Sequence, residues 1–280
     1  MTAMAQLSDA AGFTSVVYFM ERAMNDPNSP IFEIDWERTT HVNYAFGKPA
    51  PDGSVGLYDP YAAVEITYPQ FGVNNSFGLD FVRIDWEYPT EGGNNQSVVP
   101  HRPNDIANYL KVLQLFRQEL AKLPWKAELS VASPAGSDNY RHWDFTVNCG
   151  LQDHINIMTY DLAGDWSAYT DHQAKLYKDP NHPAGKDCPS DKIVLGIPAY
   201  GRSFEGTSGL RAGDVGIQGN AVGSEYFDEK LGSAYSYDPE SKLFITYESP
   251  MAAKLDFIKK YNLGGTGRAM LTLGLARRDR

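Results

Sequence analysis

Residues 80–89 read Asp-Phe-Val-Arg-Ile-Asp-Trp-Glu-Tyr-Pro, a run that predicts a buried β-strand ending in charged and aromatic side chains. Because successive side chains of a strand point to opposite faces, Arg83, Asp85 and Glu87 share one face. The other face is apolar and suits packing beneath helices. Three charges on one buried face are unfavourable unless they are paired or take part in chemistry. The run therefore predicts either a buried ion-pair cluster or a catalytic site.

Short apolar runs bounded by turn residues recur along the chain and predict further strands. They lie at residues 15–19, 41–46, 81–87, 127–133, 154–160 and 192–198. Several are continuously apolar, as expected of parallel strands that are buried on both faces. Apolar residues at helical spacing predict helices at 104–123 and, after Pro250, at 251–261. The alternation of strand and helix predicts a parallel α/β fold, in which a barrel carries its reactive residues at the carboxyl ends of the strands.

The run at 80–89 resembles the active-site strand of the family-18 glycoside hydrolases, the chitinases and their relatives. Their pattern is Asp-x-x-Asp-x-Asp-x-Glu, commonly followed by Tyr-Pro. The chain departs from this pattern at Arg83, and it matches at Asp80, Asp85, Glu87, Tyr88 and Pro89. Other segments resemble the barrel strands of this family, in the family's order. They are 15–19 and 41–46 for strands one and two, 129–136 for the fifth, 158–166 for the sixth and 193–204 for the seventh.

The resemblance implies a TIM-type (β/α)8 barrel, and two of its parts have no clear counterpart in the chain. The stretch between Phe46 and Asp80 is short and lacks the family's third-strand motif. Residues 264–280 begin like the eighth strand and then lack the expected tryptophan. We therefore expect a barrel that is incomplete around strands three and eight. The predicted domains are a catalytic barrel at 1–204, a short α+β insertion at 205–250, and the last helix and strand at 251–280.

The resemblance also implies a reaction, the hydrolysis of β-1,4-linked N-acetylglucosamine polymers such as chitin with retention of configuration. In this family the acetamide of the bound sugar is the nucleophile, so one protein acid suffices. That acid is Glu87, while Asp85 orients the acetamide and Tyr160 donates a hydrogen bond to it. The residues implied to line the sugar subsites are Tyr18, Phe46, Tyr88, Met158, Asp161, Tyr200 and Arg202. Ordinary core packing is the alternative for Tyr18, Phe46 and Met158, and we expect packing for Trp86 and Trp166.

Arg83 stands where the family has an aspartate, and this substitution bears on activity. An arginine two residues before Asp85 on the same face can form an ion pair with it and lower the pKa of Glu87. Weak or absent turnover is then expected. Alternatively, Arg83 pairs with Asp80 or Asp161 and the chemistry partly survives. Two other hypotheses stay open, a catalytically inactive chitinase-like carbohydrate-binding protein and a non-functional truncated product.

Composition narrows the choice of partners. The chain has 280 residues, a net charge of −10 and an isoelectric point near 5.0, which argues against nucleic acid because phosphate binding needs a basic stripe. No apolar run reaches the roughly 18 residues of a membrane helix, and the first residues show no signal-peptide pattern. The resemblance nevertheless implies an extracellular protein. We expect a monomer that binds chitin or chito-oligosaccharides, without membrane, cofactor or metal; Cys149 and Cys188 could be bridged or free.

Overall fold

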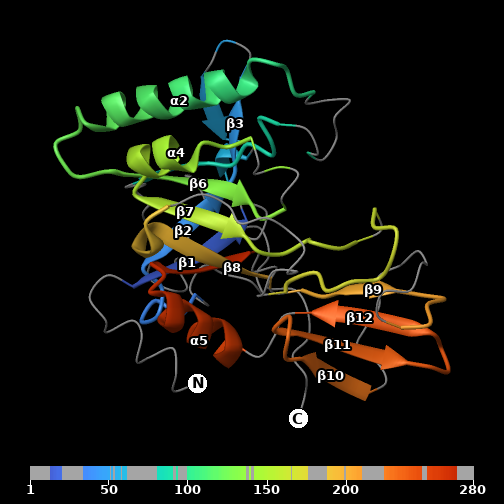
Figure 1. Ribbon diagram of the computed structural model, residues 1–280. Coiled ribbons are helices and arrows are strands. Elements are labelled where there is room, and N and C mark those ends of the chain that lie inside the picture. The colour runs from blue at the N-terminus through green and yellow to red at the C-terminus, as the bar shows by residue number, and fades with distance from the viewer. Residues whose placement is uncertain are drawn as a thin grey trace. The chain divides into compact units, whose positions relative to one another are not determined.

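The computed structural model divides the chain into two compact units, one formed by residues 1–80 with 267–280 and one by residues 81–266. Figure 1 labels the helices and strands. The residues that the structure describes are 13–20, 34–50, 52, 54–57, 59–61, 81–90, 93, 100–136, 139, 142–164, 166–175, 188–198, 200–209, 224–247 and 251–269. None of the helices within these residues combines the length and apolar character that a bilayer crossing requires.

The smaller unit contains a pair of parallel strands, β1 (Thr14–Met20) and β2 (His41–Ala45). They confirm the strands predicted at 15–19 and 41–46. A short antiparallel hairpin follows, with strands β3 (Gly47–Pro49) and β4 (Val55–Leu57). No third parallel strand lies in the described part of residues 46–61, and residues 62–80 lie outside the described ranges.

The larger unit is built on four parallel strands, β5 (Phe81–Ile84), β6 (Glu128–Pro134), β7 (His154–Met158) and β8 (Ile193–Pro198). Their order is β8-β7-β6-β5, and β13 (Gly265–Ala269) lies next to β8. β13 stands where the eighth strand was expected, and residues 270–280, where the tryptophan is missing, lie outside the described ranges. Since the strands are parallel, their carboxyl ends meet at one edge of the sheet. That edge carries the residues after each strand.

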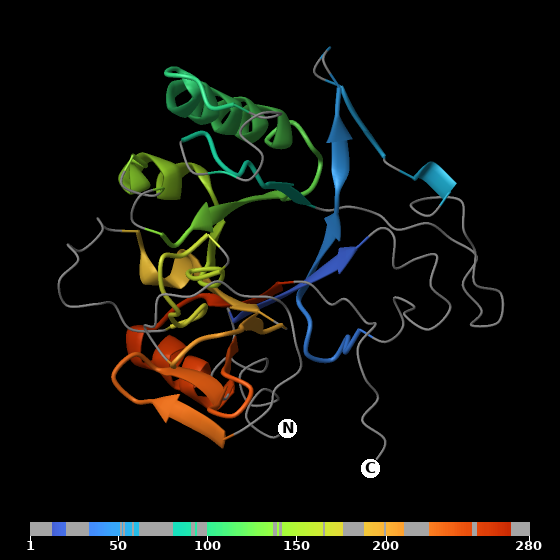
Figure 2. The same cartoon turned by 90° about the vertical axis from the view of Figure 1, so that its right-hand side faces the viewer.

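Two helices pack on one side of these strands, α2 (Asp105–Leu120) and α4 (Phe145–Leu151) (Figures 1 and 2). α2 presents Tyr109 and Leu113 to a core that also contains Leu129 and Ile155, all almost fully buried. Trp86 packs against this core, its ring centroid 6.3 Å from that of Tyr109. The packing expected of Trp86 is confirmed. α2 lies within the predicted range 104–123 but is shorter, because it ends at Leu120 and not at residue 123, the residue before Pro124.

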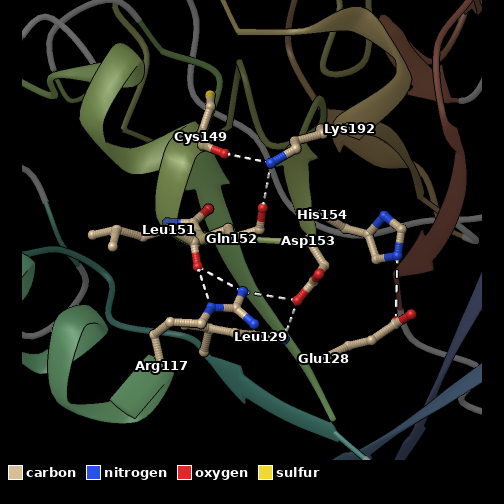
Figure 3. A network of polar contacts seen from close by, with 9 residues as sticks. All are labelled: Arg117, Glu128, Leu129, Cys149, Leu151, Gln152, Asp153, His154 and Lys192. Atoms are coloured by element: carbon tan, nitrogen blue, oxygen red, sulfur yellow. Dashed lines mark hydrogen bonds and ion pairs between the residues drawn. The ribbon is translucent and has the colours of Figure 1, made fainter. Parts of the chain in front are cut away.

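A polar network braces the carboxyl end of α4 (Figure 3). The Lys192 Nζ donates hydrogen bonds to the carbonyl oxygens of Cys149 and Gln152, at 2.7 and 2.8 Å. These carbonyls belong to the last turn of the helix and its C-cap, where no intrahelical donor is left and a cation is favoured. A disulfide joins Cys149 to Cys188 at the same place. The structure thus settles the open question of the two cysteines.

Arg117 extends this network from α2 (Figure 3). Its guanidinium donates to the carbonyl oxygen of Leu151 at 2.9 and 2.6 Å and to the carboxylate of Asp153 at 2.8 Å. The same carboxylate accepts the amide of Leu129 at 2.8 Å. Although partial burial opposes the shift, these hydrogen bonds lower the pKa of Asp153. The network ties the two helices to the amino ends of β6 and β7, opposite the edge where those strands end.

The rest of the larger unit is an antiparallel sheet followed by a helix. The sheet has the order β10-β11-β12-β9, with β9 (Arg202–Phe204), β10 (Ser224–Asp228), β11 (Ser233–Asp238) and β12 (Leu243–Tyr247). Both views show it away from α2 and α4 (Figures 1 and 2). β9 begins before the expected insertion at 205–250, whose described residues are strands, turns and bends. Helix α5 (Met251–Tyr261) follows, at the residues predicted.

Candidate active site

The candidate site lies at the carboxyl ends of β5, β7 and β8 in the larger unit. Asp85 and Glu87 follow β5, Tyr160 and Asp161 follow β7, and Tyr200 follows β8. The parallel register, which pairs Ile84 with Val131 and Pro134 with Met158, brings these ends to one edge. Residues far apart in the sequence therefore gather where barrel enzymes carry their reactive groups.

Asp85 and Glu87 form a coupled pair of carboxyl groups. Glu87 is exposed as a whole residue, but its carboxyl group is partly buried. This burial is the largest cause that raises the pKa of Glu87 to about 7, and the charge of Asp85 is the second. A hydrogen bond links the two carboxyls, and the half-buried Tyr88 donates a further one to Glu87. A hydrogen bond between two carboxyls needs a proton on one of them. The pKa of Glu87 thus lies well above that of an ordinary glutamate.

Tyr200 and Arg202 form a second group around Asp161. The Nε and one terminal nitrogen of Arg202 each lie 2.7 Å from the same oxygen of Asp161. Tyr200 donates a hydrogen bond to Asp161, and burial raises the pKa of its hydroxyl, as does the charge of Asp161. The rings of Tyr160 and Tyr200 meet edge to face, with centroids 6.3 Å apart. The charge of Asp161 also contributes to the raised pKa of Glu87, so the two groups are electrostatically connected.

Trp166 does not pack as we expected, because 60% of its surface is exposed. The guanidinium of Arg202 lies over its ring, with Cζ 4.7 Å from the ring centroid. The ring also lies beside Gly164, where an added Cβ would come within 2.5 Å of the indole. The Ser167 amide donates a hydrogen bond to the Gly164 carbonyl at 2.9 Å, on either side of Trp166. An exposed indole held by a cation and a turn offers an apolar face to a ligand.

Two glycines keep space for the site residues. A Cβ at Gly196 would lie 2.5 Å from the carbonyl oxygen of Ile157 and 2.7 Å from the ring of Tyr160. A Cβ at Gly93 would overlap the carbonyl of Glu87. The sequence alone did not point to these glycines, since only the folded chain shows what lies beside them.

The remaining predicted site residues are placed as follows. Met158 is buried at the end of β7, with 8% of its surface exposed. Tyr18 and Phe46 belong to the smaller unit, where Tyr18 is buried in β1 and Phe46 is exposed just after β2. Asp80 and the side chain of Arg83 lie outside the described part of the structure, and so does the predicted ion pair between Arg83 and Asp85. The roles of all these residues stay predictions.

Comparison with known proteins decides the family. The sequence profile of Glycosyl hydrolases family 18 matches residues 69–268, which include the carboxyl pair and the Asp161 group. The chain belongs to this family. Among similar proteins, Chitinase 1 of Aphanocladium album is 32% identical over 248 residues, which are 73% of this chain and 55% of that protein. The chain thus spans about half the length of that relative.

Solved chitinase structures establish the fold. Chitinase ChiA74 from Bacillus thuringiensis superimposes with a TM-score of 0.78 at 22% identity, covering 93% of this chain and 66% of the other. A mutant of the Ostrinia furnacalis Group II chitinase catalytic domain 2, solved in complex with penta-N-acetylchitooctaose, gives a TM-score of 0.73 at 17% identity, covering 92% and 90%. The predicted TIM-type fold is confirmed, and the curled parallel strands of the larger unit form part of such a barrel.

Proposed function

We propose that this chain hydrolyses β-1,4-linked N-acetylglucosamine polymers, with Glu87 as the general acid and the acetamide oxygen of the substrate as the nucleophile. The observation that carries this proposal is the Asp85–Glu87 pair, in which burial and a like charge raise the pKa of Glu87 to about 7. Family 18 membership supplies the reaction class, and the complex formed by the Ostrinia furnacalis protein supplies the class of ligand. Chitin and chito-oligosaccharides are accordingly the proposed substrates.

The proposed reaction has two steps. Glu87 gives its proton to the glycosidic oxygen as the bond from that oxygen to C1 breaks, and the acetamide oxygen bonds to C1 to form an oxazolinium ion. Asp85, once it no longer accepts a hydrogen bond from Glu87, stabilises the positive charge of this ion. Water then attacks C1 as the bond from C1 to the acetamide oxygen breaks and restores the acetamide, and the water gives a proton to Glu87, which regenerates the acid. Two inversions at C1 amount to retention.

The residues around Asp161 supply the proposed sugar contacts. Tyr160 donates a hydrogen bond to the acetamide, while Asp161, Tyr200 and Arg202 offer polar contacts that are fixed by mutual hydrogen bonds. The exposed ring of Trp166 adds an apolar face of the kind on which a sugar ring stacks. Tyr18 and Phe46 keep their predicted roles in the smaller unit.

A second candidate function is sugar binding without turnover, and it is favoured by Arg83, which replaces an aspartate of the family pattern. Hydrolysis of a fluorogenic N,N′-diacetylchitobioside separates the two functions. We expect weak turnover by the unchanged chain, a further loss of about 10²–10⁴-fold in Glu87→Gln, and a gain in Arg83→Asp. Glu119→Gln, an exposed glutamate on α2, is the matched control and should leave the rate unchanged. Oligosaccharide binding with no hydrolysis in any of these proteins would favour the second candidate.

The Cys149–Cys188 disulfide supports export to an oxidising compartment, because such bonds persist mainly in extracellular and related environments. An extracellular location fits a polymeric substrate that is too large to enter a cell. Thiol titration of the protein from its natural source tests this proposal. Two free thiols in the denatured protein would contradict it.

A further inference from the structure

Gln173 lies under the Asp161 group and is fully buried, with none of its surface exposed. Its Oε1 accepts the backbone amide of Asp161 at 3.4 Å, and its Nε2 donates to the carbonyl oxygen of Tyr200 at 2.8 Å. Its own backbone carbonyl accepts the amide of Leu162 at 3.0 Å, and its amide donates to the hydroxyl of Thr246 at 3.0 Å. One residue thus joins the segment after β7, the segment after β8 and strand β12.

Only an amide side chain of this length satisfies both of these partners. The Asp161 amide requires an acceptor and the Tyr200 carbonyl requires a donor, and a carboxamide offers one of each on adjacent atoms. The two partners also fix the orientation of the amide, since the reverse orientation would set donor against donor. A glutamate at this position keeps the acceptor but loses the donor, and a methionine loses both. The residue type therefore follows from the two segments that it connects.

The backbone of Asp161 gives this contact a specific consequence. Asp161 has a φ of 56°, a left-handed conformation that is uncommon for residues other than glycine and persists where neighbouring groups hold it. Gln173 accepts hydrogen bonds from the backbone amides of both Asp161 and Leu162, so it fixes the two peptide groups that flank the Asp161 Cα. The direction of the Asp161 carboxylate, and hence its pairing with Arg202, depends on this backbone.

We infer that Gln173 is a positioning residue, which sets the Asp161 carboxylate for sugar binding without contacting the sugar. The inference rests on the proposed function, because it assigns a role within the same site. A positioning role differs from general core packing because the effect of Gln173 on sugar binding passes through Asp161. Substituting Gln173 should weaken sugar binding only while the Asp161 carboxylate is present.

The test compares Gln173→Met and Gln173→Glu with the unchanged chain, using the affinity for tetra-N-acetylchitotetraose, followed by tryptophan fluorescence, and the melting temperature. We expect Gln173→Met to bind about 10- to 100-fold more weakly. Gln173→Glu keeps the bond to Asp161 and should bind more tightly than the methionine variant. Gln152→Met is the matched control, because Gln152 is also buried, at 1% exposure, but lies at the far end of the unit beside α4. It should lower the melting temperature without changing the affinity.

A double-mutant cycle with Asp161→Ala completes the test. In that background Gln173→Met should change the affinity less than about threefold, because contacting residues are not additive. Equal losses in both backgrounds, or a loss that Gln152→Met reproduces, would overturn the positioning role. An unchanged affinity in Gln173→Met and Gln173→Glu would overturn it as well. Absence of binding by the unchanged chain would instead contradict the proposed function, and the positioning role with it.

Discussion

Burial of its carboxyl and the charge of Asp85 raise the pKa of Glu87, and in the proposed reaction this sets the pH range in which Glu87 acts as an acid. An isolated glutamate is almost fully ionised at neutral pH and cannot protonate a leaving group. Burial of the Glu87 carboxyl and the charge of Asp85 both oppose that ionisation. The site therefore needs no acid of unusual type, only a glutamate beside a second carboxylate.

The pH dependence of hydrolysis should show this coupling. Since the pKa of Glu87 is raised to about 7, kcat/KM should fall as the pH rises through that value and the acid loses its proton. Asp85→Asn removes the like charge, so the falling limb should move to lower pH and the maximum should decrease. Initial rates on a fluorogenic diacetylchitobioside between pH 4 and 9 measure both changes. A falling limb at the same pH in both proteins would contradict the coupling.

Gly196 makes room for Tyr160, so a single methyl group at that position should disturb the site. Gly196→Ala forces the new Cβ against a tyrosine ring and a strand carbonyl, and overpacking of this kind destabilises by about 1–3 kcal/mol. We expect both a lower melting temperature and weaker oligosaccharide binding. Gly150→Ala is the matched control, because nothing lies within 4 Å of its added Cβ. Within α4 that change should be neutral or stabilising by about 0.5–1 kcal/mol.

At the scale of elements, the two ends of the parallel strands have different tasks. Their carboxyl ends carry the candidate active site, while their amino ends are tied to α2 and α4 by Arg117 and Lys192 (Figure 3). In barrel folds the first end is the one where catalysis occurs and the second contributes stability. Substitutions at the two ends should therefore affect different measurements.

Lys192→Met tests this division of tasks. The change leaves the carbonyl groups of Cys149 and Gln152 without their donor, and loss of a charged donor to partly buried carbonyls is worth about 1–3 kcal/mol. Urea denaturation should show this loss, with oligosaccharide affinity unchanged at a temperature where the chain is folded. Lys122→Met is the control, because its ion pair with Glu119 is exposed and worth only about 0–1 kcal/mol. Equal losses of stability in the two variants would contradict the role of Lys192.

The elements themselves were largely predictable from the sequence, because each carries its own pattern. Apolar runs located β1, β2 and the four parallel strands β5 to β8, and helical spacing located α2 and α5. They did not locate α4, the β3–β4 hairpin or the strands of the antiparallel sheet. The site was predictable only where a motif names a residue, as it does for Glu87. Gln173, Gly196 and Trp166 were not found or were misjudged, since their importance depends on which distant segments lie beside them. A buried glutamine reads in the sequence like any polar loop residue, and only folding brings it between Asp161 and Tyr200.

For the whole molecule, the chain combines a confirmed family with a length of about half that of its relative. The larger unit holds the acid pair, the Asp161 group and the disulfide within residues 81–266. All the groups named in the proposed proton transfer therefore belong to one compact unit. The site can bind and act only while this unit is folded, so the pH dependence of its stability limits the pH range of the site.

The stability of the larger unit should fall in acid because of His172. This histidine is fully buried, and its ring packs edge to face against that of Tyr235. Its Nε2 lies 3.5 Å from the carboxylate of Asp228, and the charges of Asp171 and Lys175 also act on it. Burial lowers the pKa of His172 more than the two carboxylates raise it. The folded state therefore prefers the neutral imidazole. This contribution to stability is complete above the unfolded value of about 6.5 and is lost as the pH falls through the lower folded value.

Thermal melts between pH 7.5 and 5.0 test the role of His172. The unchanged chain should lose melting temperature steadily as the pH falls, by about 2–4 °C for each kcal/mol lost in a domain of this size. His172→Gln cannot take up a proton at this position, so it should melt lower at pH 7.5 but decline less toward pH 5.0. His101→Gln, at an exposed position, should follow the unchanged chain. If the melting temperature declines equally in all three proteins, the acid sensitivity comes from groups other than His172. Asp153 is not expected to contribute in this range, because its lowered pKa places its loss of stability at lower pH.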